Sequence, residues 1–149
     1  LIVIQTFSKS FGGAGTRLGC AFSSEKNITL LDKLNLCFPV AGASVKFGLA
    51  LMNNLSLLED YTDAVKIQRQ TLAKKLEKNG YDVISGGCNW IHFNDKSNNS
   101  EATKIFKKHN LNFKNKIKLP HDYRDNWIRL TLSSDTLDQG YIKEILNEE

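Results

Sequence analysis

The hydrophobic pattern of the first forty residues predicts strands joined by a glycine-rich loop. Residues 1–4 are a short run of apolar and β-branched side chains, which predicts a buried strand in a parallel sheet. Residues 5–15 are polar and rich in glycine and predict a loop, and residues 17–22 predict a second strand. Residues 27–36 predict a short helix that ends before Pro39.

Residues 44–78 carry the apolar spacing of long helices. Asn53 and Asn54 predict a break within this stretch, and Gly80 is well placed to end it in the left-handed conformation. A long helix of this kind separates two structural units. Two apolar faces are expected, one formed by Val45, Leu49 and Met52 and the other by Leu58, Val65, Leu72 and Leu76.

The last seventy residues alternate between strand and helix patterns. Strands are predicted at residues 81–85, 90–93, 116–119 and 127–132. Asn98 with Glu101, and Thr136 with Gln139, predict the starts of two helices. The whole chain is therefore expected to be α/β: the edge of a parallel sheet, a connecting helix and a small α+β layer. The expected divisions are 1–54, 55–79 and 80–149.

Composition narrows the class of protein. The chain has 149 residues, of which 41% are hydrophobic and 24% charged, with only 2 Pro, which excludes a disordered or fibrous chain. No 18-residue apolar stretch occurs, so no membrane segment is expected. Cys20, Cys37 and Cys88 are odd in number and widely spaced, which fits buried thiols in a reducing cytoplasm. Because Leu1 already opens a strand pattern, we expect a piece of a longer chain and no signal peptide.

Charge and histidine content exclude little more. The net charge is +4, and basic residues gather between Lys104 and Arg129. A basic stretch can bind nucleic acid, and steep salt dependence would reveal it, but a solvated lysine-rich surface is the favoured interpretation, so no nucleic-acid partner is expected. His92, His109 and His121 are too scattered for a metal site, and no metal is expected.

The segment with candidate chemistry is the glycine-rich loop around Lys9. No acidic residue occurs between residues 1 and 24, so Lys9 lacks a carboxylate partner nearby in sequence, and burial beside Arg17 would favour its neutral amine. A neutral lysine can attack a carbonyl and form a Schiff base. Thr6, Ser8 and Arg17 offer donors suited to a phosphate. A phosphorylated aldehyde such as pyridoxal phosphate matches both, whereas neither a P-loop nor a dinucleotide fingerprint is present.

The ten residues 6–15 resemble the cofactor-attachment signature of class II pyridoxal-phosphate aminotransferases. Arg17-Leu-Gly follows at the spacing found in histidinol-phosphate aminotransferases, which have the fold of type I pyridoxal-phosphate enzymes. The resemblance implies that Lys9 is the catalytic lysine and that Thr6, Ser8 and Arg17 hold the cofactor phosphate. It also implies that this chain is the C-terminal half of such an enzyme: the end of the large domain, a connecting helix and the small domain.

The same resemblance extends weakly to the rest of the chain and implies a substrate side. Arg129, in a strand similar to the family's late arginine-bearing strand, would bind the substrate carboxylate, and Asn89 would line the substrate site. Lys114 stands where histidinol-phosphate enzymes usually have a second arginine, so the substrate is left open. A homodimer acting on a small amino acid and an oxo acid or phosphorylated ketone is implied. Two alternatives are kept: decarboxylation of a phosphorylated amino acid, and a catalytically silent interaction module.

Overall fold

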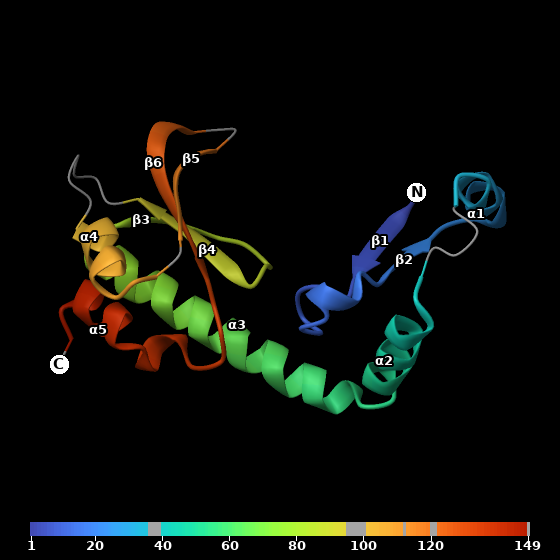
Figure 1. Cartoon of the computed structure of the whole chain (residues 1–149). Helices are drawn as coiled ribbons and strands as arrows, with labels where there is room; N and C mark the ends of the chain where they lie inside the picture. Colours follow the sequence, from blue (N-terminus) through green and yellow to red (C-terminus); the bar gives the residue numbers. More distant parts are fainter. Residues whose placement is uncertain (36–39, 95–100, 112, 120–121, 149) are drawn as a thin grey trace. The chain divides into compact units, whose positions relative to one another are not determined.

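The computed structural model describes residues 1–35, 40–94, 101–111, 113–119 and 122–148. The chain divides into two compact units, Leu1–Tyr61 (unit 1) and Thr62–Glu149 (unit 2). Figure 1 shows that the long helix α3 (Leu55–Lys78) crosses the boundary between them. The expected division at residues 54 and 79 stays a prediction. None of the described helices is both long and apolar enough to cross a lipid bilayer.

Unit 1 contains a β-hairpin followed by helices. Strand β1 (Val3–Thr6) pairs with β2 (Gly19–Phe22), and a short 3-10 helix η1 (Ala14–Thr16) lies in the loop between them. The pairing is antiparallel, with Val3 opposite Phe22, so the prediction of a buried parallel strand is wrong. The loop returns the chain directly beside itself, which makes a hairpin, and the side chains of β1 are exposed.

The helices of unit 1 follow the predicted pattern. Helix α1 (Glu25–Asp32) begins two residues before its predicted start and ends four residues before its predicted end at residue 36, because a turn follows at residues 33–34. Helix α2 (Gly42–Met52) is separated from α3 at Asn53 and Asn54, as predicted. The Asn54 side-chain amide donates to the Ala50 carbonyl at 2.8 Å, which satisfies one of the free carbonyls at the end of α2.

Unit 2 is a four-stranded antiparallel sheet with helices on one face. The sheet order is β3-β4-β6-β5, formed by Asp82–Ser85, Trp90–Asn94, Asp122–Thr131 and Lys114–Leu119, so β5 is an edge strand, as predicted. Helix α3 ends at Gly80 with φ of +86°, and Tyr81 N–H donates to Leu76 O at 3.1 Å, which is a Schellman-type end. Helices α4 (Glu101–Lys108) and α5 (Gly140–Leu146) complete the unit.

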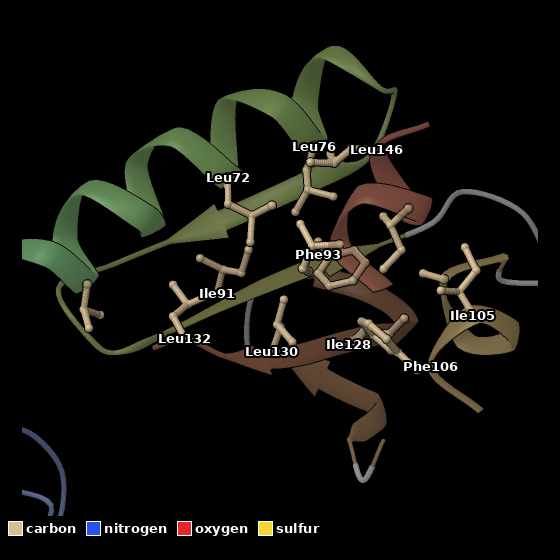
Figure 2. Packing of buried hydrophobic residues seen from close by; sticks show 14 residues of the cluster. Leu72, Leu76, Ile91, Phe93, Ile105, Phe106, Ile128, Leu130, Leu132 and Leu146 are labelled. Carbon is tan, nitrogen blue, oxygen red and sulfur yellow. The ribbon is translucent and has the colours of Figure 1, made fainter. Parts of the chain in front are cut away.

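The core of unit 2 lies between the sheet and these helices. Figure 2 shows Leu72 and Leu76 of α3 pointing toward Ile91 and Phe93 of β4, with Phe106 of α4 beside them. Alternate residues of β4 and β6 face this core, which confirms the predicted period-2 strands. The fully buried large side chains of the cluster are Leu72, Leu76, Ile91, Phe93, Phe106, Ile128 and Ile142.

Three local expectations need correction or lie outside the described residues. Helix α5 begins at Gly140; Thr136 lies in a preceding 3-10 turn (Thr136–Asp138), where its buried hydroxyl accepts a hydrogen bond from Ser133 N–H at 2.7 Å. Cys20 and Cys88 are exposed, because one lies in the open hairpin and the other in the turn before β4, so their predicted burial is wrong. Cys37 and Asn98 lie outside the described residues.

Candidate functional site

The lysine loop is closed by backbone hydrogen bonds that continue the hairpin. Phe7 N–H donates to Leu18 O at 3.0 Å, one step beyond the Thr6–Gly19 pair. Ser8 comes directly after Phe7 and Arg17 directly before Leu18. The two residues therefore lie at neighbouring positions at the base of the loop. The Thr6 hydroxyl donates to the Ser8 hydroxyl at 2.9 Å and accepts from Ser8 N–H at 3.1 Å. Two of the predicted phosphate donors therefore lie side by side.

Helix α2 packs against this loop within unit 1. Phe7 is 8% exposed, and its backbone carbonyl accepts from Gly13 N–H at 2.7 Å. A Cβ built on Gly13 would lie 2.8 Å from that carbonyl and 3.1 Å from the ring of Phe47, and one on Gly48 would lie 2.5 Å from the Leu18 side chain. Glycine is therefore required at Gly13, where a methyl group would meet the Phe7 carbonyl, whereas a methyl group at Gly48 would force the Leu18 side chain to move.

Arg17 adopts an uncommon backbone conformation at the end of the loop. Its φ is +54°, in the left-handed region that is costly for a residue with a Cβ. The guanidinium donates one hydrogen bond, to Ala14 O at 3.3 Å, which leaves most of its N–H groups unused by the protein. No carboxylate of the described chain forms an ion pair with Arg17 or Lys9, so both positive charges are available to a ligand.

Lys9 opens onto a cavity of about 280 Å³ that lies entirely within unit 1. Its side chain is exposed, so the burial expected from the sequence is not provided by the described residues. The walls are mainly apolar, and the residues with polar side chains among them are Lys9, Ser10, Asn54 and Tyr61. Thr6, Ser8 and Arg17 do not line it. The lining residues are Lys9, Ser10, Phe11, Gly12, Leu51, Asn54, Leu57, Leu58 and Tyr61.

The donors of this loop fit a phosphorylated aldehyde. Thr6 and Ser8 bring two hydroxyls together, Arg17 adds an unpaired guanidinium, and Lys9 adds an amine without an acidic partner. Hydroxyl and guanidinium donors are the groups that hold phosphate in proteins, and a lysine amine is the nucleophile that condenses with an aldehyde. The loop therefore carries both kinds of group, although Lys9 lines the cavity and Thr6, Ser8 and Arg17 do not.

The predicted substrate residues of unit 2 gather around β6. Arg129 lies directly opposite Lys114 of β5 on one side and His92 of β4 on the other, so the three residues share the sheet face that points away from the core. The Arg129 guanidinium carbon lies 5.5 Å from the centre of the Trp90 ring, within cation–π range. Partial burial, and then the charge of Arg129, lower the pKa of His92, so its neutral form is favoured.

Arg129 and Lys114 also line one cavity of about 310 Å³ in unit 2, whereas Asn89 does not. Asn89 is held at the end of β4 by its carbonyl, which accepts from Leu132 N–H at 2.8 Å. Sequence analysis did not single out Trp90, although strand alternation places it on the same face as His92. It also missed the aromatic wall of this cavity, formed by Phe106, Phe113 and Tyr141, because these residues come from three separate segments.

The family model for aminotransferase class I and II matches residues 1–146, and the chain belongs to this family. A histidinol-phosphate aminotransferase of Lactococcus lactis subsp. cremoris is 29% identical over 141 residues, covering 91% of this chain and 38% of the relative. An aromatic amino acid aminotransferase of Nocardia farcinica is 33% identical over 91 residues, covering 61% of this chain and 25% of the relative.

Solved structures agree on the fold. The histidinol-phosphate aminotransferase of Sinorhizobium meliloti, crystallised in complex with pyridoxal-5'-phosphate, aligns with a TM-score of 0.72 at 21% identity, over 97% of this chain and 38% of that one. The mixed α/β fold is therefore that of the aminotransferases, as the resemblance implied. The chain spans less than half the length of each of these relatives.

Proposed function

We propose that this chain carries the lysine-bearing part of a pyridoxal-phosphate-dependent aminotransferase. The reaction would move an amino group between an amino acid and a 2-oxo acid or a phosphorylated ketone. The observation that carries the proposal is the loop of unit 1, where Lys9, without an acidic partner in the described residues, directly follows Ser8, whose hydroxyl adjoins that of Thr6. Membership of the aminotransferase family supports the same chemistry.

The residues of unit 1 would hold the cofactor and move a proton. Pyridoxal phosphate supplies an aldehyde carbon to the lysine amine and a ring that withdraws electrons from the bonds at the substrate Cα. Thr6 and Ser8 would donate hydrogen bonds to the phosphate, and Arg17 would pair with its charge. Lys9 Nζ would be the amine offered to the aldehyde carbon, and as a free amine it would take up the proton of the substrate Cα.

The residues of unit 2 would hold the substrate. Arg129 binds the carboxylate through two parallel N–H groups, a geometry that lysine cannot copy. The Trp90 ring under the guanidinium restrains its orientation at 5.5 Å. Lys114 adds a second positive charge opposite Arg129. The role of Asn89 on the substrate side rests on the resemblance alone. A homodimer and a cytoplasmic location, both implied by the resemblance or by cysteine content, stay predictions.

The absorbance of the protein with pyridoxal phosphate tests the cofactor proposal. We expect the protein to acquire the absorbance band of a lysine Schiff base and to lose it in Lys9→Ala, because Lys9 is the lysine of the glycine-rich loop that carries the phosphate donors. Lys26→Ala is the matched control, since Lys26 is an exposed lysine of α1 in the same unit. Borohydride should fix the adduct on the peptide that contains residue 9. The proposal would be contradicted if the band persisted in Lys9→Ala, or if it were lost to the same extent in Lys9→Ala and Lys26→Ala.

Product analysis separates the alternative reactions that share these cofactor residues. Oxo-acid formation from an amino acid supports amino transfer, whereas carbon dioxide release from a phosphorylated amino acid supports decarboxylation. A protein that forms the Lys9 adduct but releases neither product would be a catalytically silent interaction module. In each case Arg17→Ala should weaken the binding of pyridoxal phosphate more than the binding of pyridoxal, because only pyridoxal phosphate has a phosphate group.

A further inference from the structure

A histidine that the proposed function leaves without a role lies beside Arg129 on the outer face of the unit 2 sheet, the face that points away from the core. His92 of β4 pairs directly with Arg129 of β6 on one side and with Ile84 of β3 on the other. Its neighbours along β4, Ile91 and Phe93, are fully buried in the core, so strand alternation turns the imidazole to the outer face. Side chains at directly opposed antiparallel positions start about 5 Å apart, so the imidazole and the guanidinium interact.

The charged side chains around His92 on this face are unevenly distributed. Arg129 lies directly opposite, and Lys114 of β5 lies opposite Arg129 on its far side. Asp82 of β3 lies one pair further along, opposite Asn94, and has an interaction of its own. No hydrogen bond or ion pair with another described residue holds the His92 imidazole. The immediate charged neighbour of this histidine is therefore a cation.

The cation and partial burial both act against a proton on His92. Burial first, and then the charge of Arg129, lower its pKa. The guanidinium carbon lies 5.5 Å from the centre of the Trp90 ring, a contact that keeps Arg129 on the same face. An anion bound to the guanidinium would offset the charge that the imidazole experiences, so protonation would become easier. The converse follows by linkage: a protonated His92 adds a positive charge beside the anion and strengthens its binding.

We propose that His92 takes up a proton from solvent when an anion binds to Arg129, so that this site binds anions more tightly as the pH falls. That a substrate carboxylate is the natural anion rests on the proposed function. The linkage itself is a property of unit 2 and needs no cofactor. For the aminotransferase it predicts a KM for the amino-acid or oxo-acid substrate that rises with pH as His92 loses its proton.

A proton NMR titration of the three histidines tests the linkage on the full chain without cofactor. Sulfate is the probe, because it keeps its charge over the measured range and cannot condense with Lys9. Chloride at the same ionic strength is the reference, since salt alone screens the charge of Arg129. We expect sulfate to raise the pKa of His92 and to bind about three- to tenfold tighter at about pH 5.5 than at about pH 8.

Three variants show which group is responsible. His92→Gln keeps a polar side chain and should remove the pH dependence of sulfate affinity. His109→Gln is the matched control and should retain it, because His109 lies 2.9 Å from Glu144 in the contact between α4 and α5. Arg129→Gln should raise the pKa of His92 without sulfate and abolish the effect of sulfate, a result that a merely structural role of His92 would not produce.

The titration of the parent chain needs no variant, so it remains decisive if a variant fails to fold. The inference would be overturned if sulfate left the pKa of His92 unchanged, if it raised those of His92 and His109 equally, or if the pH dependence survived His92→Gln. If the Lys9 absorbance band forms while His92 does not respond to sulfate, the proposed function stands and this inference falls. The reverse result removes the proposed function alone.

Discussion

The two units of the chain use similar amounts of apolar sequence in different ways. Unit 2 buries its apolar side chains in one cluster in which seven large residues are almost fully inaccessible to water. Unit 1 buries Phe7 but leaves apolar residues of β1, α1 and α2 open, among them Ile4 at 79% and Leu49 at 60% exposure. Among the large hydrophobic residues whose exposure the structure describes, only Ile67 and Ile84 of unit 2 are exposed.

This difference shows that a segment can form regular secondary structure without burying its apolar side chains in a core. Both units form the hydrogen-bonded elements that their sequence patterns predict. Only in unit 2 do the apolar faces of those elements meet one another, so burial stabilises that unit. In unit 1 the lysine loop instead depends on a few close contacts, such as Phe7 and Leu18 against Gly48.

The largest expected effect is therefore a core truncation in unit 2. Leu72→Ala removes a side chain with 0% exposure and should lower the free energy of unfolding by about 2–5 kcal/mol, through lost burial and a cavity. Leu49→Ala, the same change on an exposed position of α2, should stay within about 0.5 kcal/mol. Denaturant titration followed by circular dichroism measures the free energy of unfolding of both variants. Tryptophan fluorescence follows the unfolding of unit 2, which contains Trp90 and Trp127, the two tryptophans of the chain.

Ile67→Ala controls for helix propensity, since Ile67 lies on the same helix as Leu72 but is 61% exposed. A cost for Leu49→Ala as large as that for Leu72→Ala would break the comparison between the units. It would mean that the apolar surface of unit 1 is buried in solution, for example by self-association, which a concentration series of the same titration would detect.

The accuracy of the sequence predictions follows the same division. In unit 2 the spacing of Leu72 and Leu76 predicted the helix, and the alternation around Ile91 and Ile128 predicted the strands. Both predictions succeeded because the apolar face of each element is buried in this structure. In unit 1 the apolar residues 1–4 were expected in a buried parallel strand, and they form an exposed antiparallel one. A run of apolar residues specifies a strand, but its partner depends on which segment the chain brings beside it.

A second prediction tests the few close contacts of unit 1. Gly13→Ala would place a methyl group 2.8 Å from the Phe7 carbonyl and should cost about 1–3 kcal/mol in the local stability of the lysine loop. The amide of residue 13, which donates to that carbonyl, should then exchange with solvent deuterium about 5- to 100-fold faster. Gly15→Ala is the matched control, since nothing lies within 4 Å of the added methyl group. Equal protection in the two variants would show that the loop is not held by this contact.

The candidate site was only partly predictable for a related reason. The neighbouring hydroxyls of Thr6 and Ser8 follow from their sequence spacing, because a turn of this size brings residues two apart together. The opposition of Lys114 and Arg129 depends on strand register between segments fifteen residues apart, which hydrophobic alternation alone does not specify. The Trp90 ring beneath Arg129 comes from a third strand and needed the full sheet order.

The smallest expected effect is an electrostatic one at the surface of unit 2. Glu144 accepts from Lys108 at 2.8 Å and lies 2.9 Å from His109 Nε2, and these two hydrogen bonds, Lys108 first, lower the pKa of Glu144 below its usual value of 4.5. A lowered carboxyl pKa in the folded state stabilises that state above pH 4.5, and the contribution is lost as the pH falls through the lowered value. Glu144→Gln should therefore reduce the stability of unit 2 slightly at about pH 7, and the difference from the parent chain should vanish once the pH has fallen below the lowered pKa of Glu144. Glu77→Gln, at an exposed glutamate of α3 that pairs with no cation in the described residues, controls for the charge change. A deficit that persists unchanged in acid would assign the role of Glu144 to packing instead of charge.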